Sequence, residues 1–181
     1  MEPAKKEVPY LNELMLRYHK PILIYCFHML RQRQDAEDAT QDIFMKAMNH
    51  SQNGEGIQNE SAWLYRIAHN HCSNMLRRRK LLSFLPFGQE RKRELSQEAS
   101  YAQVDESMAI DELLAKLPVE DRSVMVLRII EDKSYEEIGM ILHAAPATVR
   151  KKFQRAKNKV KKWIELEEEE HEQKKQGISY I

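Results

Sequence analysis

The sequence has few of the residues that break helices or cross-link chains. Its 181 residues include five glycines, six prolines and two cysteines. The cysteines, Cys26 and Cys72, lie far apart in the sequence and imply no disulfide framework, which fits a reducing cytoplasm. No apolar run approaches the length of a membrane span, and we expect no signal peptide. Scarce glycine and proline with 31% charged residues are typical of an all-helical protein.

Enzyme motifs are also missing. The sequence has no phosphate-binding G-x-x-x-x-G-K, no nucleophile elbow and no dense cluster of acids and bases. His69, His71 and Cys72 suggest a metal site, but on a helix only positions 69 and 72 share a face, and no second cluster follows. We therefore expect no catalytic residues, no metal, no cofactor and no small-molecule substrate. The two cysteines are interpreted as small core residues.

The formal net charge is only +1, but the charge is unevenly distributed. Residues 146–162 contain eight Lys or Arg and no acid, whereas residues 81–145 contain 13 acids and seven bases. A charged partner would interact with the local charge of each segment rather than with the average charge of the chain. The distribution therefore predicts a partner for the basic segment in particular.

Apolar residues in the first half recur at the 3–4 spacing of amphipathic helices. They predict helices over 11–30, 35–48 and 60–79, with a loop at 49–56. Pro21 either kinks the first helix or divides it into two. These helices form the predicted first domain, residues 1–80.

Residues 81–107 lose this periodicity and are predicted to be a flexible linker, partly helical. Its apolar start, "LLSFLPF", either docks on a partner or packs on the neighbouring domain. A second helical domain is predicted over 108–166, followed by an acidic polar tail over 167–181. Its helices are expected at 110–117, 119–132, 134–143 and 146–170.

The last two of these helices have the pattern of a helix-turn-helix. Ser134 and Glu137 match a capping box, Pro146 suits a first helical turn, and only about three residues, 143–145, separate the helices. The second helix of such a motif enters the DNA major groove, where Arg and Gln suit base edges and Lys suits phosphates. The alternative is a solvated basic helix face.

Two other helices carry surface patterns. The 60–79 helix combines aromatic side chains, Arg66 and Asn70 with a basic end, "RRRK", which suits unpaired DNA bases. Trp63 itself is interpreted as a core residue rather than as a base contact. The 35–48 helix exposes a row of acids that DNA would not attract. This row favours a protein partner.

Together these segments resemble a sigma factor of the extracytoplasmic-function group, group IV of the sigma-70 family of bacterial transcription initiation subunits. "DAEDATQDIF" resembles the family's segment for the clamp helices of the RNA polymerase β′ subunit. "WLYRIAHNHCSNMLRRRK" resembles the segment that melts and reads the minus-ten element. "LPVEDRSVMVLRIIEDKSYEEIGMILHAAPATVRKKFQRAKNKV" resembles the domain that reads the minus-thirty-five element.

The resemblance implies three sets of contact residues. Those for polymerase are Asp35, Asp38, Gln41, Asp42 and Phe44. Those for the minus-ten element are Arg66, Asn70, Asn74, Arg77, Arg78 and Arg79. Those for the minus-thirty-five element are Arg128, Thr148, Arg150, Lys151, Gln154, Arg155 and Lys157.

The implied partners are core RNA polymerase, promoter DNA and an anti-sigma factor. The implied location is the cytoplasm, or the inner membrane face where the anti-sigma factor is membrane-bound. The sequence departs from the family pattern at Asn74 (usually Asp), at Asp42 (often Glu) and in the turn at 143–145, which often has glycine. A helix-turn-helix regulator that does not bind polymerase is the main alternative.

Overall fold

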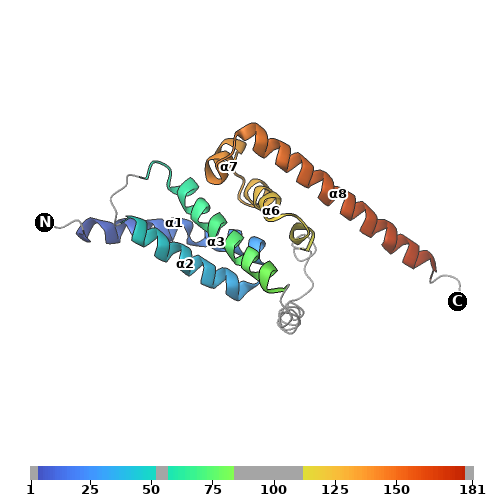
Figure 1. The fold of residues 1–181 in the computed structure, drawn as a ribbon, viewed down its shortest axis with the longest axis horizontal. Helices are drawn as coiled ribbons and strands as arrows, with labels where there is room; N and C mark the ends of the chain where they lie inside the picture. Colours follow the sequence, from blue (N-terminus) through green and yellow to red (C-terminus); the bar gives the residue numbers. More distant parts are fainter. Residues whose placement is uncertain (1–3, 52–56, 84–111, 178–181) are drawn as a thin grey trace.

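The computed structural model describes residues 4–51, 57–83 and 112–177, and every regular element in these ranges is helical. The first unit consists of α1 (Ala4–Leu30), α2 (Arg33–Ser51) and α3 (Glu60–Ser83). The second consists of α6 (Val119–Met125), a π-helical turn η2 (Val126–Ile130), α7 (Tyr135–Leu142) and α8 (Pro146–Gly177). Figure 1 labels the α-helices of both units. The all-helical prediction is confirmed. Within these ranges no helix is long and apolar enough to cross a membrane.

Some predictions fall outside the described residues. Residues 84–111 hold most of the predicted linker and most of the "LLSFLPF" segment. The first linker residues, 81–83, complete α3 instead. Residues 112–115 are helical and belong to the helix predicted before Pro118.

Helix α1 runs without a break through Pro21. Proline lacks an N–H and so removes one hydrogen bond from the helix, but the flanking turns bury Ile22, Tyr25 and Cys26 completely. This packing keeps the helix continuous, although proline by itself disfavours the interior of a helix. Of the two alternatives for Pro21, division into two helices is therefore wrong.

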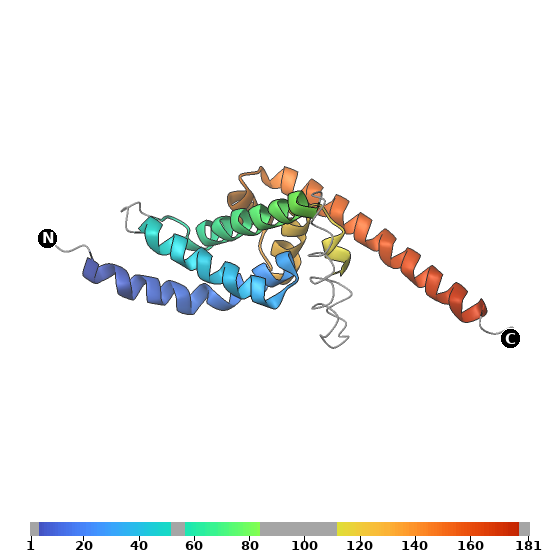
Figure 2. The same cartoon turned by 60° about the horizontal axis from the view of Figure 1, so that its bottom comes forward.

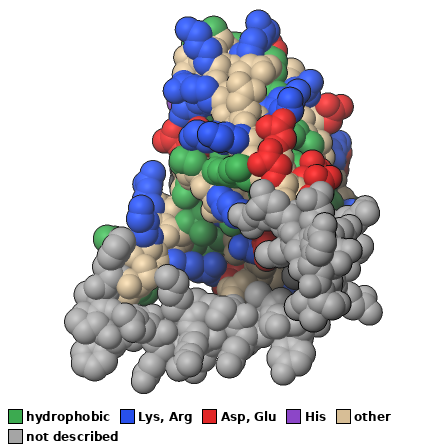
Figure 3. Space-filling view, turned by 90° about the vertical axis from the view of Figure 1, so that its right-hand side faces the viewer, with side chains coloured by type: hydrophobic (Ala, Val, Ile, Leu, Met, Phe, Trp, Pro, Cys, Tyr) green, Lys and Arg blue, Asp and Glu red, His purple; other side chains and the backbone are tan. Residues whose placement is uncertain are grey.

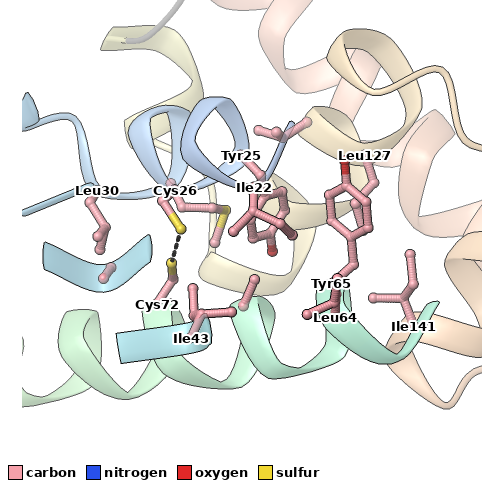
Figure 4. Packing of buried hydrophobic residues seen from close by; sticks show 14 of the residues in the cluster. Ile22, Tyr25, Cys26, Leu30, Ile43, Leu64, Tyr65, Cys72, Leu127 and Ile141 are labelled. Carbon is pink, nitrogen blue, oxygen red and sulfur yellow. Dashed lines mark hydrogen bonds between the residues drawn. The ribbon is translucent and has the colours of Figure 1, made fainter. Parts of the chain in front are cut away.

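The first unit is a bundle in which α1, α2 and α3 lie side by side (Figure 2). Each helix buries one stripe at the 3–4 spacing, including Ile22 on α1, Ile43 on α2 and Leu64 on α3. Cys26 and Cys72 are fully buried and their Sγ atoms lie 3.7 Å apart (Figure 4). Their prediction as small core residues is confirmed.

Helices α7 and α8 form the predicted helix-turn-helix. The Ser134 hydroxyl oxygen accepts a hydrogen bond from the Glu137 N–H, and the Glu137 carboxylate accepts one from the Ser134 N–H. The two bonds complete the capping box at the start of α7. His143 ends α7 in the left-handed conformation, with φ of 51°. A Cβ on Gly139 would lie only 2.6 Å from the carbonyl oxygen of Ala144, so the tight turn requires glycine there rather than in the turn itself.

Helix α8 is longer than predicted. It reaches Gly177 instead of residue 170, and its second half extends beyond the rest of the molecule (Figure 1). Val149 and Ala156 are fully buried and fix its first half on the second unit. Lys116 pairs with Glu167 at 2.8 Å and lies 6.0 Å from the ring centre of Trp163, so the contact with the body continues past residue 160.

The two units share one hydrophobic core. Tyr25 and Tyr65 meet edge to face, with ring centres 5.7 Å apart, and lie close to Leu127 and Ile141 of the second unit (Figure 4). All four side chains are almost completely buried. The units are therefore packed on each other in this structure.

A polar junction lies within this contact. The hydroxyl of Tyr25 on α1 is hydrogen-bonded to that of Ser123 on α6 at 2.8 Å, and Nδ1 of His69 on α3 lies 3.0 Å from the same Ser123 oxygen. Nearby, the Tyr65 hydroxyl donates to a carboxylate oxygen of Glu131. Buried polar groups cost free energy unless they are paired, so these bonds fix how the units fit together.

Replacing Gly139 by alanine should destabilise the fold by about 1–3 kcal/mol, because the new methyl group meets a backbone oxygen that cannot turn aside. Urea unfolding followed by circular dichroism measures the change. Met140→Ala, at an exposed neighbouring position, is the matched control and should change stability by less than about 0.5 kcal/mol. Equal effects of the two substitutions would contradict the tight turn.

Acidification should weaken the contact between the units. Burial lowers the pKa of His69 below its ordinary value; Arg77 and Lys152 act in the same direction and Glu120 opposes them. The unfolded chain, in which His69 is exposed, therefore binds a proton more readily than the folded chain. The contribution of neutral His69 to the free energy of unfolding is complete at about pH 7.5 and is lost as the pH drops through about 6.5. Urea unfolding at pH 7.5 and 5.5 should show this loss, and His69→Gln should reduce it. A pH dependence that His69→Gln leaves unchanged would contradict the role of this side chain.

Candidate nucleic-acid interface

The first half of α8 carries a broad basic face. Buried Val149 and Ala156, with partly buried Phe153, define its inner side, and exposed polar and basic side chains cover the outer side in two adjacent stripes. Six of the predicted minus-thirty-five residues are exposed on it: Thr148, Arg150, Lys151, Gln154, Arg155 and Lys157. Viewed from the right-hand side of Figure 1, Lys and Arg side chains gather over the upper part of the molecule (Figure 3).

Four side chains of this face line one shallow depression: Arg150, Lys151, Gln154 and Arg155. The group combines cations with one amide that can both donate and accept. Bidentate contacts of Arg to guanine and of Gln to adenine use these groups. The four side chains therefore carry the donors and the acceptor that contacts to base edges and phosphate oxygens use.

Two neighbouring lysines, Lys152 and Lys159, form ion pairs that hold α8 against α6. Lys152 pairs with Glu120, and the ammonium of Lys159 lies 3.7 Å from a carboxylate oxygen of Asp121. Both acids are on α6. Because these pairs occupy the flank of α8, the exposed cations are concentrated on the opposite face.

Arg128 is the one predicted minus-thirty-five residue outside α8. It lies in η2, half-buried, and its Nη1 donates to Asp132 at 3.1 Å and to the carbonyl oxygen of Lys133 at 3.2 Å. Its guanidinium also lies over the ring of Tyr135, as does that of Arg150. The structure thus brings Arg128 to the edge of the basic face.

A second polar stripe follows α3. Asn70, Asn74, Arg77 and Arg78 are exposed, and the first three recur every three or four residues. Amide groups followed by cations suit bases first and backbone phosphates further along. The stripe has the composition of a surface for opened DNA.

Arg66 is the first residue of the same stripe, but its side chain is already bonded to another helix of the protein. Its Nη2 donates to the carbonyl oxygen of Met140 on α7 at 2.6 Å, and its buried Nε has no acceptor among the described residues. Helix α7 therefore covers the start of the stripe. The side chain of Arg66 is partly buried, and its guanidinium is held by the second unit.

Arg79 is also paired within the protein. Its guanidinium bonds to Asp35, so the structure joins a predicted minus-ten residue to a predicted polymerase residue. This pair ties the end of α3 to the start of α2. Both side chains are partly buried, and neither presents a free charge in this arrangement.

The exposed face of α2 is acidic with apolar members. Asp38, Gln41 and Asp42 are exposed on it, together with Met45 and Met48. The two methionines were not among the predicted contacts, although Met45 lies three to four residues after Asp42 and Gln41, and Met48 lies three residues after Met45, which places both on the same face. The face offers both charge and apolar surface.

Phe44 differs from the other predicted polymerase residues because it is buried. Only 4% of its surface is exposed, and its ring stacks on His19 at 6.0 Å. Its role as a polymerase contact stays a prediction. Its burial favours a packing role, in which Phe44 lies under the exposed face of α2 and holds that helix in place. Behind Asp42, His71 on α3 lies 2.7 Å from the ammonium of Lys46 and 3.7 Å from the Asp42 carboxylate.

Sequence reasoning missed Tyr135, Ser123 and Glu131. Tyr135 follows directly after the capping residue of α7, which was a usable signal for a fixed position next to the basic helix. Ser123 and Glu131 bond to residues of the other unit, and no local pattern indicates such pairs. In the described part of the chain, no three His, Cys, Asp or Glu side chains converge in a way that could hold a metal ion.

Comparison with known proteins matches two family models to the chain. Sigma-70 region 2 matches residues 14–81, and Sigma-70, region 4 matches residues 107–160. RNA polymerase sigma factor YlaC of Bacillus subtilis is 30% identical over 167 residues, which cover 88% of this chain and 95% of the relative. ECF RNA polymerase sigma factor SigW of the same species is 30% identical over 158 residues, covering 81% and 84%.

Two solved structures share the fold. The sigma factor RpoE of Bartonella quintana, in complex with the anti-sigma factor NepR, matches 85% of this chain and 96% of its own with a TM-score of 0.64 and 21% identity. CnrH, in complex with the cytosolic domain of CnrY, matches 86% and 88% with a TM-score of 0.63 and 22% identity. The family models and the curated relatives together show that the chain belongs to the sigma-70 family of RNA polymerase sigma factors.

Proposed function

We propose that the chain directs RNA polymerase to promoters by binding the core enzyme through α2 and promoter DNA through α3 and α8. The observation that carries the proposal is the separation of three surfaces on three helices of one chain. An acidic face lies on α2, an amide and arginine stripe on α3, and a basic face on α8. A regulator that only bound DNA would need neither the α2 face nor the α3 stripe.

The proposed division of labour follows the chain. Residues 1–80 bind the β′ clamp helices of polymerase and read the minus-ten element. Residues 108–166 read the minus-thirty-five element, with residues 81–107 as the linker and 167–181 as an acidic tail. Acids from Glu165 to Glu169 on α8 are exposed and would be repelled by phosphate, so the DNA contact ends before them.

The contact between the two units has a consequence for promoter binding. Arg66 cannot reach DNA while it bonds to Met140 on α7, so the units have to separate before the whole α3 stripe is available. The buried, unpaired Nε of Arg66 makes the closed contact less favourable than full pairing would. Opening on polymerase is therefore an accessible step.

We also propose control by an anti-sigma factor. Two proteins with this fold were solved with a partner bound: RpoE with the anti-sigma factor NepR, and CnrH with the cytosolic domain of CnrY. A partner that stabilised the closed contact, or covered the α3 stripe, would keep this chain from promoters. We place the protein in the cytoplasm, or at the inner membrane face where its anti-sigma factor is membrane-bound, and assign it no catalytic step of its own.

Reversing two charges on α2 should impair polymerase binding. Asp38→Arg with Asp42→Arg replaces exposed acids that would pair with basic groups on the clamp, and loss of such pairs typically costs roughly 2–5 kcal/mol. The affinity of the double variant for core polymerase, measured by fluorescence titration, should fall accordingly.

The matched control places the same change of charge on another helix. Glu168→Arg with Glu169→Arg alters exposed acids of α8 and should leave core affinity close to that of the unmodified chain. Circular dichroism confirms that both variants are folded. Unchanged core affinity of folded Asp38→Arg/Asp42→Arg would sink the polymerase assignment and favour a regulator that does not bind polymerase.

Asn70 should read one unpaired base of the minus-ten element. It is exposed at the centre of the α3 stripe, and its amide offers a donor and an acceptor to a base taken out of the stack. With fork-junction DNA whose minus-ten segment is single-stranded, Asn70→Ala should reduce discrimination at one position by roughly 1–3 kcal/mol. Binding of holoenzyme to the duplex minus-thirty-five element should stay the same.

Asn12→Ala is the control for this measurement, because Asn12 is an exposed asparagine on α1 away from the stripe. It should leave all base preferences unchanged. If Asn70→Ala lowers only thermal stability and no preference, Asn70 is structural, and the minus-ten reader lies elsewhere.

A further inference from the structure

Tyr135 lies where three elements of the second unit meet. Its ring centre is 5.1 Å from the guanidinium carbon of Arg150 on α8 and 5.6 Å from that of Arg128 in η2. The same ring packs at 60° against Phe153, with centres 6.0 Å apart. One aromatic ring thus contacts two predicted DNA-binding arginines from separate elements.

The position of the ring is fixed from both sides. Tyr135 is the first residue of α7, directly after the capping box, where Ser134 and Glu137 exchange two hydrogen bonds. Phe153 belongs to the turn of α8 that follows fully buried Val149. The ring is therefore a rigid platform, while the arginine side chains over it have several rotatable bonds.

Arg150 depends on this platform more than Arg128 does. Arg128 also bonds to Asp132 and to the carbonyl oxygen of Lys133. Arg150 forms no ion pair and no hydrogen bond with any residue that the structure describes, so the Tyr135 ring is its one oriented contact there. A cation over an aromatic face is held by about 0.5–1 kcal/mol at exposed sites.

We propose that Tyr135 is a positioning residue that orients Arg150, together with Arg128, for promoter reading. This inference rests on the proposed role of α8 in reading the minus-thirty-five element. The negative face of the ring attracts both guanidinium groups and brings two like charges to one edge of the basic face. The arginines then meet DNA with fewer orientations to lose, and Arg150 keeps the direction that a bidentate base contact needs.

The test measures binding of holoenzyme, made with the full chain, to a duplex library randomised in the minus-thirty-five element. Arg150→Ala first identifies the base position that depends on Arg150. Tyr135→Leu should reduce preference at that same position by about 2- to 5-fold. Tyr135→Phe keeps the ring without the hydroxyl and should retain the preference.

A double variant separates positioning from general loosening of the fold. If Tyr135 acts through Arg150, then Tyr135→Leu added to Arg150→Ala should cause no further loss of preference at that position. If Tyr135→Leu instead weakens all sequences alike, or lowers affinity as much in the Arg150→Ala background, the residue is only structural and the inference is overturned.

The outcomes also distinguish this inference from the function on which it rests. Arg150→Ala without effect on any base preference would overturn the reading role of α8, and the positioning role with it. Arg150→Ala with a clear effect, combined with Tyr135→Leu without one, would overturn the positioning role alone. Loss of preference in Tyr135→Phe would assign the effect to the hydroxyl and would likewise overturn the proposal.

Discussion

One buried guanidinium connects the ends of three helices in this protein. Arg122 on α6 is 7% exposed, and its nitrogens donate to three backbone carbonyls at 2.7–3.0 Å. Met29 contributes its carbonyl from the last turn of α1, and Leu114 and Ala115 contribute theirs from the helical residues before Pro118. These carbonyls lie near the ends of their helices, where the negative ends of the helix dipoles stabilise the cation, and the Leu114 carbonyl also accepts from the Leu117 N–H. A buried carbonyl left unpaired costs about 1–3 kcal/mol, so the three bonds strongly favour one arrangement.

The position of Arg122 next to Ser123 links this arrangement to the functional surfaces. Ser123 bonds to Tyr25, and with α6 fixed in this way α7 lies over the start of the α3 stripe. The α3 stripe, which is the proposed surface for opened DNA, and the helix-turn-helix are therefore not independent while the two units are packed together. A partner that acts on the contact between the units would act on both proposed DNA surfaces at once, which is a physical basis for controlling the two proposed promoter contacts through one interface.

Periodicity predicted the helices well because each buries a stripe against its own neighbours. The ends of helices were harder, since α3 and α8 continue past the last clear apolar position. The single helix predicted over 119–132 is instead α6 followed by a π-helical turn, closed by a bond from the Glu131 N–H to the Val126 carbonyl. One extra residue in a turn leaves no signature in hydrophobic spacing.

The candidate site, like the fold, could be predicted from the sequence only in part. Exposed members of the α2, α3 and α8 faces follow from helical spacing once their buried stripes are known. Helical spacing does not predict which of these side chains are already bonded within the protein. Arg66 bonds to α7 and Arg79 pairs with Asp35, in both cases across long sequence separations. Phe44 illustrates the opposite case, since its family position suggested a contact while its spacing with Ile43 and Ala47 placed it among core residues.

The distribution of charge explains how a nearly neutral protein can bind a polyanion at a chosen face. Lys152 and Lys159 are neutralised by α6, whereas Arg150 and Lys151 stay exposed at the start of α8. The exposed acids of α2 and of the second half of α8 repel DNA from the remaining surface. Because binding that is independent of sequence grows with the number of phosphates neutralised, a low net charge limits binding at random sites. The positive charge on α8 remains, and it acts where Arg150 and Gln154 are proposed to distinguish bases.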